Sequence, residues 1–127
     1  MRIVLALALL AGCQAVPDGG DISVFRPEYI GVQTRLLEDD LVQFRTEMRG
    51  ARDNQDVIAY GDCVAAQYAL IRGFGFARHV RTNVTRQGGI WRGDGVYTVS
   101  QAIPGGLRTI EAEVALSECA AQGIPAV

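Results

Sequence analysis

The 127-residue chain holds few side chains suited to chemistry, and its single histidine, His79, is the first to consider. The residues around it, Arg78-His79-Val80-Arg81, follow the alternation of a β-strand. That alternation places His79 with Arg81 and Asn83 on the strand face opposite Val80, so we expect an exposed side chain. None of the three serines stands in a Gly-x-Ser-x-Gly motif, the signature of a strained nucleophile turn.

The pair Cys63 and Cys119 also makes a poor metal site, because tetrahedral zinc usually takes four ligands and the single histidine is not enough to complete the set. Glycines at 88–89 and 93–95 lack the strand-loop-helix setting of a phosphate loop and predict turns or bulges instead. We therefore predict no catalytic residue, no metal ligand and no cofactor. The alternative that stays open is a small hydrolase or thiol-redox enzyme that uses His79 or the pair Cys63 and Cys119.

Arginine supplies all 12 basic residues of the chain, and five arginines lie in the acid-free span 72–92. Arg78, Arg81 and Arg86 fall on one predicted strand and form a candidate binding face for an anionic surface or an unknown acidic partner. The alternative interpretation pairs these arginines across strands with Glu111 and Glu113. The net charge of −2 argues against a nucleic-acid partner.

The first 13 residues carry the most specific signal. Met1 and Arg2 precede an unbroken apolar run over residues 3–10, and Ala11, Gly12 and Cys13 follow. As a helix this run would be about 12 Å long, less than half of the ~30 Å hydrocarbon core of a membrane. It is therefore too short for a stable transmembrane anchor and is typical of an export signal.

Leu10-Ala11-Gly12-Cys13 resembles the lipobox of bacterial lipoproteins. The resemblance implies that the leader 1–12 is removed, that the Cys13 thiol receives a diacylglyceryl group, and that the new amino terminus is acylated. Three acyl chains would anchor the protein in membrane lipid. In Gram-negative lipoproteins an aspartate after the cysteine favours the inner membrane. Gln14 stands there instead, so the expected location is the periplasmic face of the outer membrane, with an ordinary secretory signal as the alternative.

Cys63 and Cys119 remain once Cys13 carries lipid. An even number of cysteines in an exported chain, on elements expected to pack together, predicts a disulfide. Two buried free thiols or a metal pair are the alternatives.

Two strands joined by a turn are predicted near the start of the domain. Apolar and polar residues alternate over 32–36 and again over 42–48, on either side of Glu38-Asp39-Asp40. The second strand has an apolar inner face and a polar outer face. Its inward residues are Val42, Phe44, Thr46 and Met48, and its outward residues are Gln43, Arg45, Glu47 and Arg49.

A helix follows, with Asp53 or Asn54 placed to accept backbone N–H bonds at its start and Gly73 placed to end it. Its apolar stripe includes Tyr68 and Ile71. Three further strands are predicted over 76–86, 90–103 and 107–116, with glycine-rich turns between them. In the last strand the inward residues are Ile110, Ala112, Val114 and Leu116.

The order β-β-α-β-β-β with short turns predicts an α+β fold, a two-layer sandwich in which one helix covers an antiparallel sheet of four to five strands. Hydrophobic residues at 49% and charged residues at 20% are typical of a folded domain. We predict a signal peptide over 1–12, a lipidated terminus and flexible tether over 13–30, one domain over 31–119, and a loose tail over 120–127.

The function predicted from sequence is that of a lipid-anchored cell-envelope lipoprotein that acts as a non-catalytic binding or assembly module. Beyond the lipobox, the mature domain resembles only small uncharacterised envelope lipoproteins, which supply no functional residues.

Overall fold

Strand β2 (Leu41–Arg49) shows how the apolar pattern builds the sheet. Val42, Phe44, Thr46 and Met48 are 0–2% exposed, whereas Arg45 and Arg49 between and beyond them are exposed. Alternation with a period of two therefore sets one face of the strand against the core, and the predicted register of this strand is confirmed.

The structure, a computed structural model, describes residues 25–103 and 108–125. The lipobox and Cys13 lie outside the described residues. The elements, in chain order, are β1 (Glu28–Leu36), β2 (Leu41–Arg49), α2 (Asn54–Ile71), β3 (Phe76–Gln87), β4 (Ile90–Ser100), β5 (Thr109–Glu111) and α3 (Ala112–Gln122). The strands form one antiparallel sheet in the order β1-β2-β4-β3-β5. The predicted α+β class and antiparallel sheet are confirmed.

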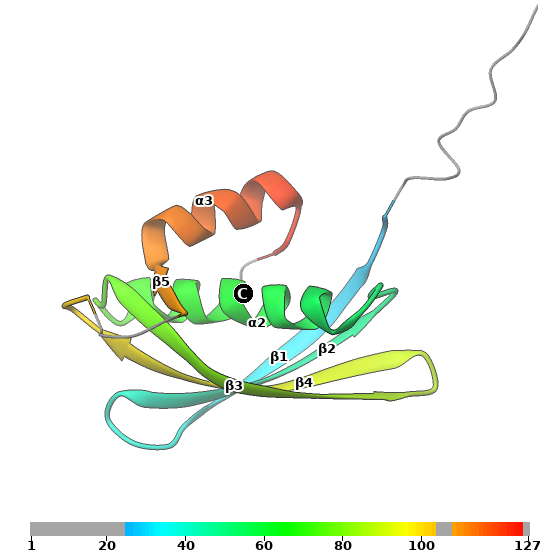
Figure 1. Cartoon of the computed structure of the whole chain (residues 1–127), viewed down its shortest axis with the longest axis horizontal. Coiled ribbons are helices and arrows are strands. Elements are labelled where there is room, and N and C mark those ends of the chain that lie inside the picture. Colours follow the sequence, from blue (N-terminus) through cyan, green and yellow to red (C-terminus); the bar gives the residue numbers. More distant parts are fainter. Residues whose placement is uncertain (1–24, 104–107, 126–127) are drawn as a thin grey trace, which may run out of the picture.

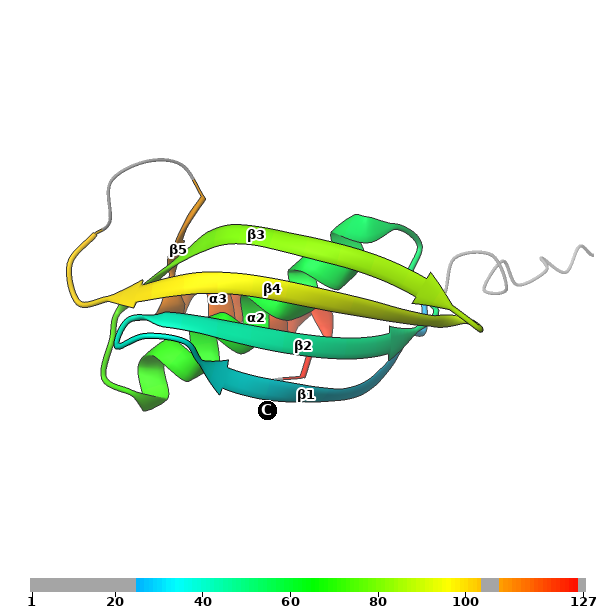
Figure 2. The same ribbon diagram turned by 90° about the horizontal axis from the view of Figure 1, so that it is seen from below.

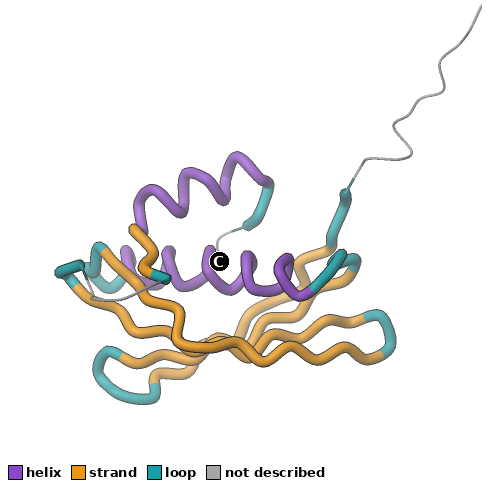
Figure 3. Tube along the Cα trace, viewed as in Figure 1, coloured by secondary structure: helices purple, strands orange, loops and turns teal. Residues whose placement is uncertain are grey.

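Both helices lie on the same side of the twisted sheet, with α2 against the strands and α3 over α2 (Figure 1). The trace coloured by element shows the same arrangement, with most of the sheet below α2 and with the short strand β5 beside α2, leading into α3 (Figure 3). The core between α2 and the sheet includes Phe44, Val57, Val64 and Tyr97. Neither of these helices combines the length and the apolarity that crossing a bilayer would require.

Helix α2 begins and ends as the sequence predicts. The Asp53 side chain accepts a hydrogen bond of 2.9 Å from the Gln55 backbone N–H, which satisfies one free donor of the first turn. Gly73 follows the last turn with φ +85°, a conformation that favours glycine. Ile71, predicted on the apolar stripe, is instead 71% exposed because the helix reaches its end there.

Helix α2 approaches β4 very closely at two glycines. A Cβ atom on Gly93 would lie 2.6 Å from Val57 Cγ1, and one on Gly61 would lie 2.9 Å from Tyr97 Oη. Gly93 sits inside β4 and not in a turn or bulge, so the predicted reason for this glycine was wrong. Its physical reason is the close packing of the helix on the strand.

The end of the domain differs most from prediction. The expected strand over 107–116 is only Thr109–Glu111, and Ala112–Gln122 is a helix. Ala112 is fully buried and Cys119 is 6% exposed, two turns apart on one helix face, whereas Val114 is 48% exposed. The segment is rich in alanine and its buried residues have helical spacing, and both properties favour a helix. The alternation of Ile110, Ala112 and Val114 wrongly indicated a strand.

The helix α3 also changes the predicted domain limits. Residues 120–122, predicted to belong to a loose tail, complete the helix, and Gly123 ends it with φ +74°. At the other end, residues 28–30 belong to β1 and not to a tether. Because α3 covers α2, the fold has a second helical layer that the predicted two-layer sandwich lacks.

A pair of substitutions tests this arrangement. The Tyr68 ring packs edge-on against Phe44 with 5.4 Å between centroids, whereas Val114 faces solvent. We expect Tyr68→Ala to lower the free energy of unfolding by about 2 kcal/mol, since it removes a half-buried aromatic ring. Val114→Ala should change it by less than about 0.5 kcal/mol. Urea unfolding measures both changes. A large loss of unfolding free energy for Val114→Ala would instead support the predicted strand, in which Val114 points into the core.

Candidate functional site

The sheet face that points away from α2 carries no described helix (Figure 2). Residues alternate between this face and the core, so the outward positions of β1 to β4 can be assigned from strand register and burial. Six exposed arginines have outward register on these strands. Arg81 among them borders a separate cavity, and we call the surface that carries the other five the arginine face: Arg35, Arg45, Arg49, Arg78 and Arg92.

The arginine face holds more positive charge than its own carboxylates neutralise. Its acidic residues are Glu28, Glu47 and Asp94. Glu47 Oε2 lies 3.8 Å from Arg92 Nε, and Asp94 Oδ1 accepts a 2.7 Å hydrogen bond from the Gln43 amide. The other four arginines of the face form no ion pair within residues 25–103 and 108–125. Positive charge therefore gathers here although the whole chain is net negative.

The centre of the arginine face is hollowed. A depression of about 760 Å³ is bordered by Arg45, Asn83, Thr85 and Arg92, and also by Glu47 and Asp94, whose carboxylates contact Arg92 and Gln43. Gly31 leaves room at its edge because it has no side chain. Guanidinium groups beside amide and hydroxyl groups can form paired hydrogen bonds to carboxylate or phosphate oxygens. The geometry of this face therefore suits an anionic partner.

Of the predicted binding residues, Arg78 and Arg81 have the same outward register in the sheet, whereas Arg86 does not. Arg78 belongs to the arginine face. Arg81 has the same register but borders a separate cavity at the edge of β3. Arg86 lies opposite Trp91 in the sheet, on the core side of the strand, and its guanidinium stacks 4.8 Å from the Trp91 ring centroid. The structure therefore separates Arg86 from the face that carries Arg78 and Arg81.

The alternative pairing of these arginines with Glu111 and Glu113 is wrong. Within residues 25–103 and 108–125 the ion pairs are Arg52–Asp56 at 2.8 Å and Arg92–Glu47 at 3.8 Å. Glu111 lies opposite Phe76 at the end of β5, on the outer sheet face, but forms no ion pair within the described residues, and Glu113 lies in the first turn of α3.

His79 lies on the core side of β3, opposite to the prediction. The strand register shifts between His79 and Arg81, which makes Val80 an extra, bulged residue that is 42% exposed. A bulge of one residue exchanges the two faces for the residues on one side of it. The His79 ring therefore packs against Tyr97, with 5.0 Å between centroids, and its Nε2 lies 2.6 Å from Thr82 Oγ1.

His79 is one end of a polar network beneath α2. The Tyr97 hydroxyl donates a 2.7 Å hydrogen bond to Asp62 Oδ1, and the Thr82 hydroxyl also bonds to Tyr97. With the contact from His79 to Thr82, the network joins β3, β4 and α2. Burial raises the pKa of Tyr97 far above its usual range, so this phenol stays protonated and acts as a donor.

Asp62 is the carboxylate of this network. Burial raises its pKa, and the hydrogen bond from Tyr97 and the nearby charges of His79 and Arg108 offset that effect only in part. Sequence reasoning missed Asp62, Thr82 and Tyr97 because they are far apart in the chain. The one available signal was an acidic residue between the buried positions Gly61 and Cys63 of the helix.

The raised pKa of Asp62 predicts a specific pH dependence of stability. A carboxyl group with a higher pKa in the folded state stabilises the fold below its unfolded pKa, and this contribution is lost as the pH rises through the folded pKa. Asn cannot titrate, so we expect the free energy of unfolding of the wild type to fall relative to Asp62→Asn as the pH rises from acid to neutral.

Urea unfolding of both proteins across this range gives the measurement. Asp56→Asn is the matched control with opposite sign, because the hydrogen bond from Arg52 lowers the pKa of Asp56 and its contribution is lost as the pH falls. A difference between wild type and Asp62→Asn that stays constant or grows with pH would contradict the assignment.

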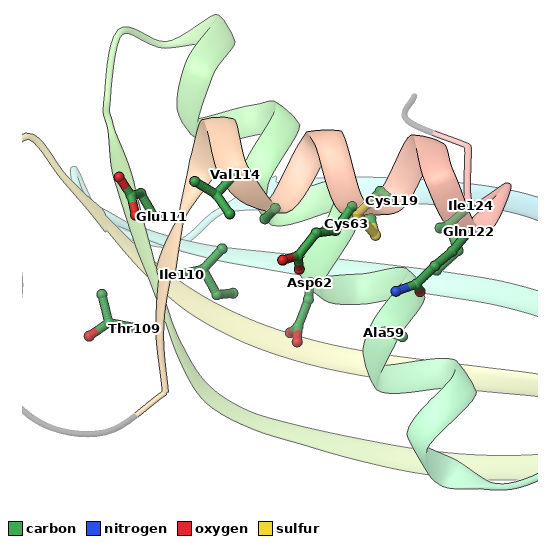
Figure 4. A pocket seen from close by; sticks show the side chains of 12 residues that line it. Ala59, Asp62, Cys63, Thr109, Ile110, Glu111, Val114, Cys119, Gln122 and Ile124 are labelled. Atoms are coloured by element: carbon green, nitrogen blue, oxygen red, sulfur yellow. A yellow bond between two sulfur atoms is a disulfide. The ribbon is translucent and has the colours of Figure 1, made fainter.

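Cys63 and Cys119 form a disulfide in the structure, linking α2 to α3 with 6.0 Å between Cα atoms (Figure 4). Both are nearly buried, at 3% and 6% exposure. A cavity of about 410 Å³ lies beside the bond, bordered by residues from α2, β5 and α3. Among the described residues, no group of three or more His, Cys, Asp or Glu side chains is arranged to hold a metal ion.

The matches to known proteins cover the strands and helices described above. Residues 29–123 match the family model of the YNQ4 C-terminal domain. The chain is also 36% identical over 93 residues to an uncharacterized 26.9 kDa protein in the nqo8 5′ region of Paracoccus denitrificans. That match covers 73% of this chain and 36% of the relative, so the chain spans about a third of the relative's length. No solved structure matches.

Proposed function

The chain belongs to the YNQ4 C-terminal domain family, and on that premise we propose that it is a lipid-anchored, non-catalytic binding module of the cell envelope. Cys13 would carry the acyl chains, and the arginine face would bind an anionic envelope component. The location proposed is the periplasmic face of the outer membrane, because Gln14 and not aspartate follows Cys13.

One observation carries the binding role: four arginines of an uncovered sheet face have no carboxylate partner among the described residues. Water solvates the charge of an exposed arginine, so the stability of the fold does not require a carboxylate partner for these residues. Their gathering on one face, with Arg45 at the border of the hollow, nevertheless creates a positive field that attracts anionic groups.

The test compares two double variants with the same change in charge. Arg45→Gln with Arg78→Gln removes two charges from the arginine face, whereas Arg72→Gln with Arg86→Gln removes two charges that stack on Tyr68 and Trp91. Each is made with Cys13→Ser, so that acyl chains cannot hold the protein on lipid. Binding to vesicles that contain phosphatidylglycerol is measured by co-sedimentation.

We expect the arginine-face variant to bind about 30-fold more weakly, because each arginine near an anionic surface contributes about 1 kcal/mol. The stacked-arginine variant should bind like the Cys13→Ser protein. High salt should reproduce the loss, since it shortens the screening length from about 8 Å to about 3 Å. Equal losses in the two variants, or binding that ignores salt, would contradict the proposed role of this face.

A second candidate function, a small hydrolase, is favoured by one contact. His79 Nε2 lies 2.6 Å from Thr82 Oγ1, a distance suited to a base and a hydroxyl nucleophile. The Thr82 hydroxyl is also bonded to Tyr97, which favours a structural use of this group. If His79→Ala abolishes the cellular phenotype while the arginine-face variant leaves it intact, the enzyme becomes the better account.

The thiol-redox alternative has less support. Exchange needs a thiolate that can reach one sulfur of the disulfide in line, and both half-cystines are almost fully buried between α2 and α3.

A further inference from the structure

A cavity separate from the arginine face opens at the edge of the sheet between α2, β3 and β5. Its volume is about 540 Å³, within the range of small-molecule sites. Gln55, Ile58 and Asp62 border it from α2, and His79 and Thr82 border it from β3. One apolar wall and several converging polar groups are the usual composition of such sites.

The floor of the cavity is held in a fixed geometry by the polar network. Asp62 receives the Tyr97 hydroxyl at 2.7 Å, and Tyr97 is itself fully buried. A carboxylate can accept several hydrogen bonds, so the bond from Tyr97 leaves Asp62 able to accept another from a ligand. Asp62 is only partly buried and borders the cavity, where a bound molecule can reach it.

The rim of the cavity is positively charged. Arg81 and Arg108 border it, and neither forms an ion pair within the described ranges 25–103 and 108–125. Arg108 has φ +67°, a left-handed conformation that costs energy for a residue with a side chain. Its carbonyl oxygen accepts a 3.2 Å hydrogen bond from the His79 backbone N–H, which holds the strained residue against β3. Such strain is often retained where a residue must face a ligand.

We propose that this cavity binds a small carboxylate that carries a hydroxyl group, with its carboxylate facing Arg81 and Arg108 and its hydroxyl donating to Asp62. Two guanidinium groups select the anionic end. A ligand ammonium would add a positive charge beside these two guanidinium groups, so a neutral hydroxyl is the better donor to Asp62.

Lactate and propionate form a matched pair of probes, because they differ by the hydroxyl group alone. Each is titrated into the purified full-length protein, and the His79 ring resonances are followed by NMR. We expect lactate to shift them saturably and to bind about tenfold more tightly than propionate, the effect of one hydrogen bond to a charged group. Absence of a saturable shift, or equal affinities for the two probes, would overturn the proposal.

Three variants separate the two contacts. Arg108→Gln, at an exposed position of the rim, should weaken both probes, and Asp62→Asn should reduce the preference for lactate. Arg72→Gln removes a charge that stacks on Tyr68, does not border the cavity, and should leave both affinities unchanged. Unchanged binding to Arg108→Gln would reject the site even if Asp62→Asn failed to fold. Because none of these results depends on vesicle binding, the cavity and the arginine face are tested separately.

Discussion

Replacing Cys63 and Cys119 together by serine is expected to lower the free energy of unfolding by about 4 kcal/mol. The two residues are 56 positions apart, and their bond ties the middle of α2 to the end of α3. A covalent link over a loop of this length restricts the unfolded chain strongly, while the folded chain already holds the two elements together. For a domain of this size the loss would be a large part of the total stability.

Denaturant unfolding of the double variant measures this loss. Wild-type protein with its disulfide reduced is the matched control and should show a loss of similar size. Peptide mapping without reductant, after rapid alkylation, should recover Cys63 and Cys119 in one linked fragment. Free thiols at both positions, or a double variant within about 1 kcal/mol of wild type, would contradict the disulfide as the link between the helices.

Cys13→Ser is expected to abolish anchoring almost completely. Thioether and amide linkages at Cys13 would together hold three acyl chains, and each buried CH₂ group contributes about 0.8 kcal/mol, so the anchored protein should not dissociate. Serine has no thiol to accept the diacylglyceryl group. Mass spectrometry of membrane-extracted wild-type protein should find a chain that begins at Cys13 and carries acyl mass.

The matched control for anchoring is Gln14→Asp. It keeps the acceptor thiol, so the protein should stay acylated but move from the outer to the inner membrane on density-gradient fractionation. Recovery of unacylated wild-type protein that begins at any other residue would reject the lipobox interpretation.

The sheet was predictable because its pattern is strong and local. The alternation in β2, the Asp53 cap and the glycine after α2 each depend on residues within a few positions of one another. Strands β1, β3 and β4 follow from the same alternation of apolar and polar residues. The Ala112–Gln122 segment was not predictable in this way, since a short apolar alternation fits both a strand and a helix.

The candidate sites were harder to predict because they depend on tertiary structure. One bulged residue, Val80, exchanges the faces of β3, so it reverses His79 and separates Arg86 from Arg78. The bond between Tyr97 and Asp62 joins residues 35 positions apart and follows from the packing of α2 on β4. The role of Gly93 follows from the same packing.

Photo-crosslinking in living cells tests the arginine face most directly. A crosslinking amino acid at Thr85 lies beside the hollow of that face, and one at Glu113 lies exposed on α3, on the opposite side of the molecule. We expect Thr85 to give discrete adducts with an anionic envelope component, adducts that Arg45→Gln with Arg78→Gln removes, and Glu113 to give none. Adducts from Glu113 alone, or adducts from Thr85 that survive the loss of both arginines, would contradict a binding role for this face.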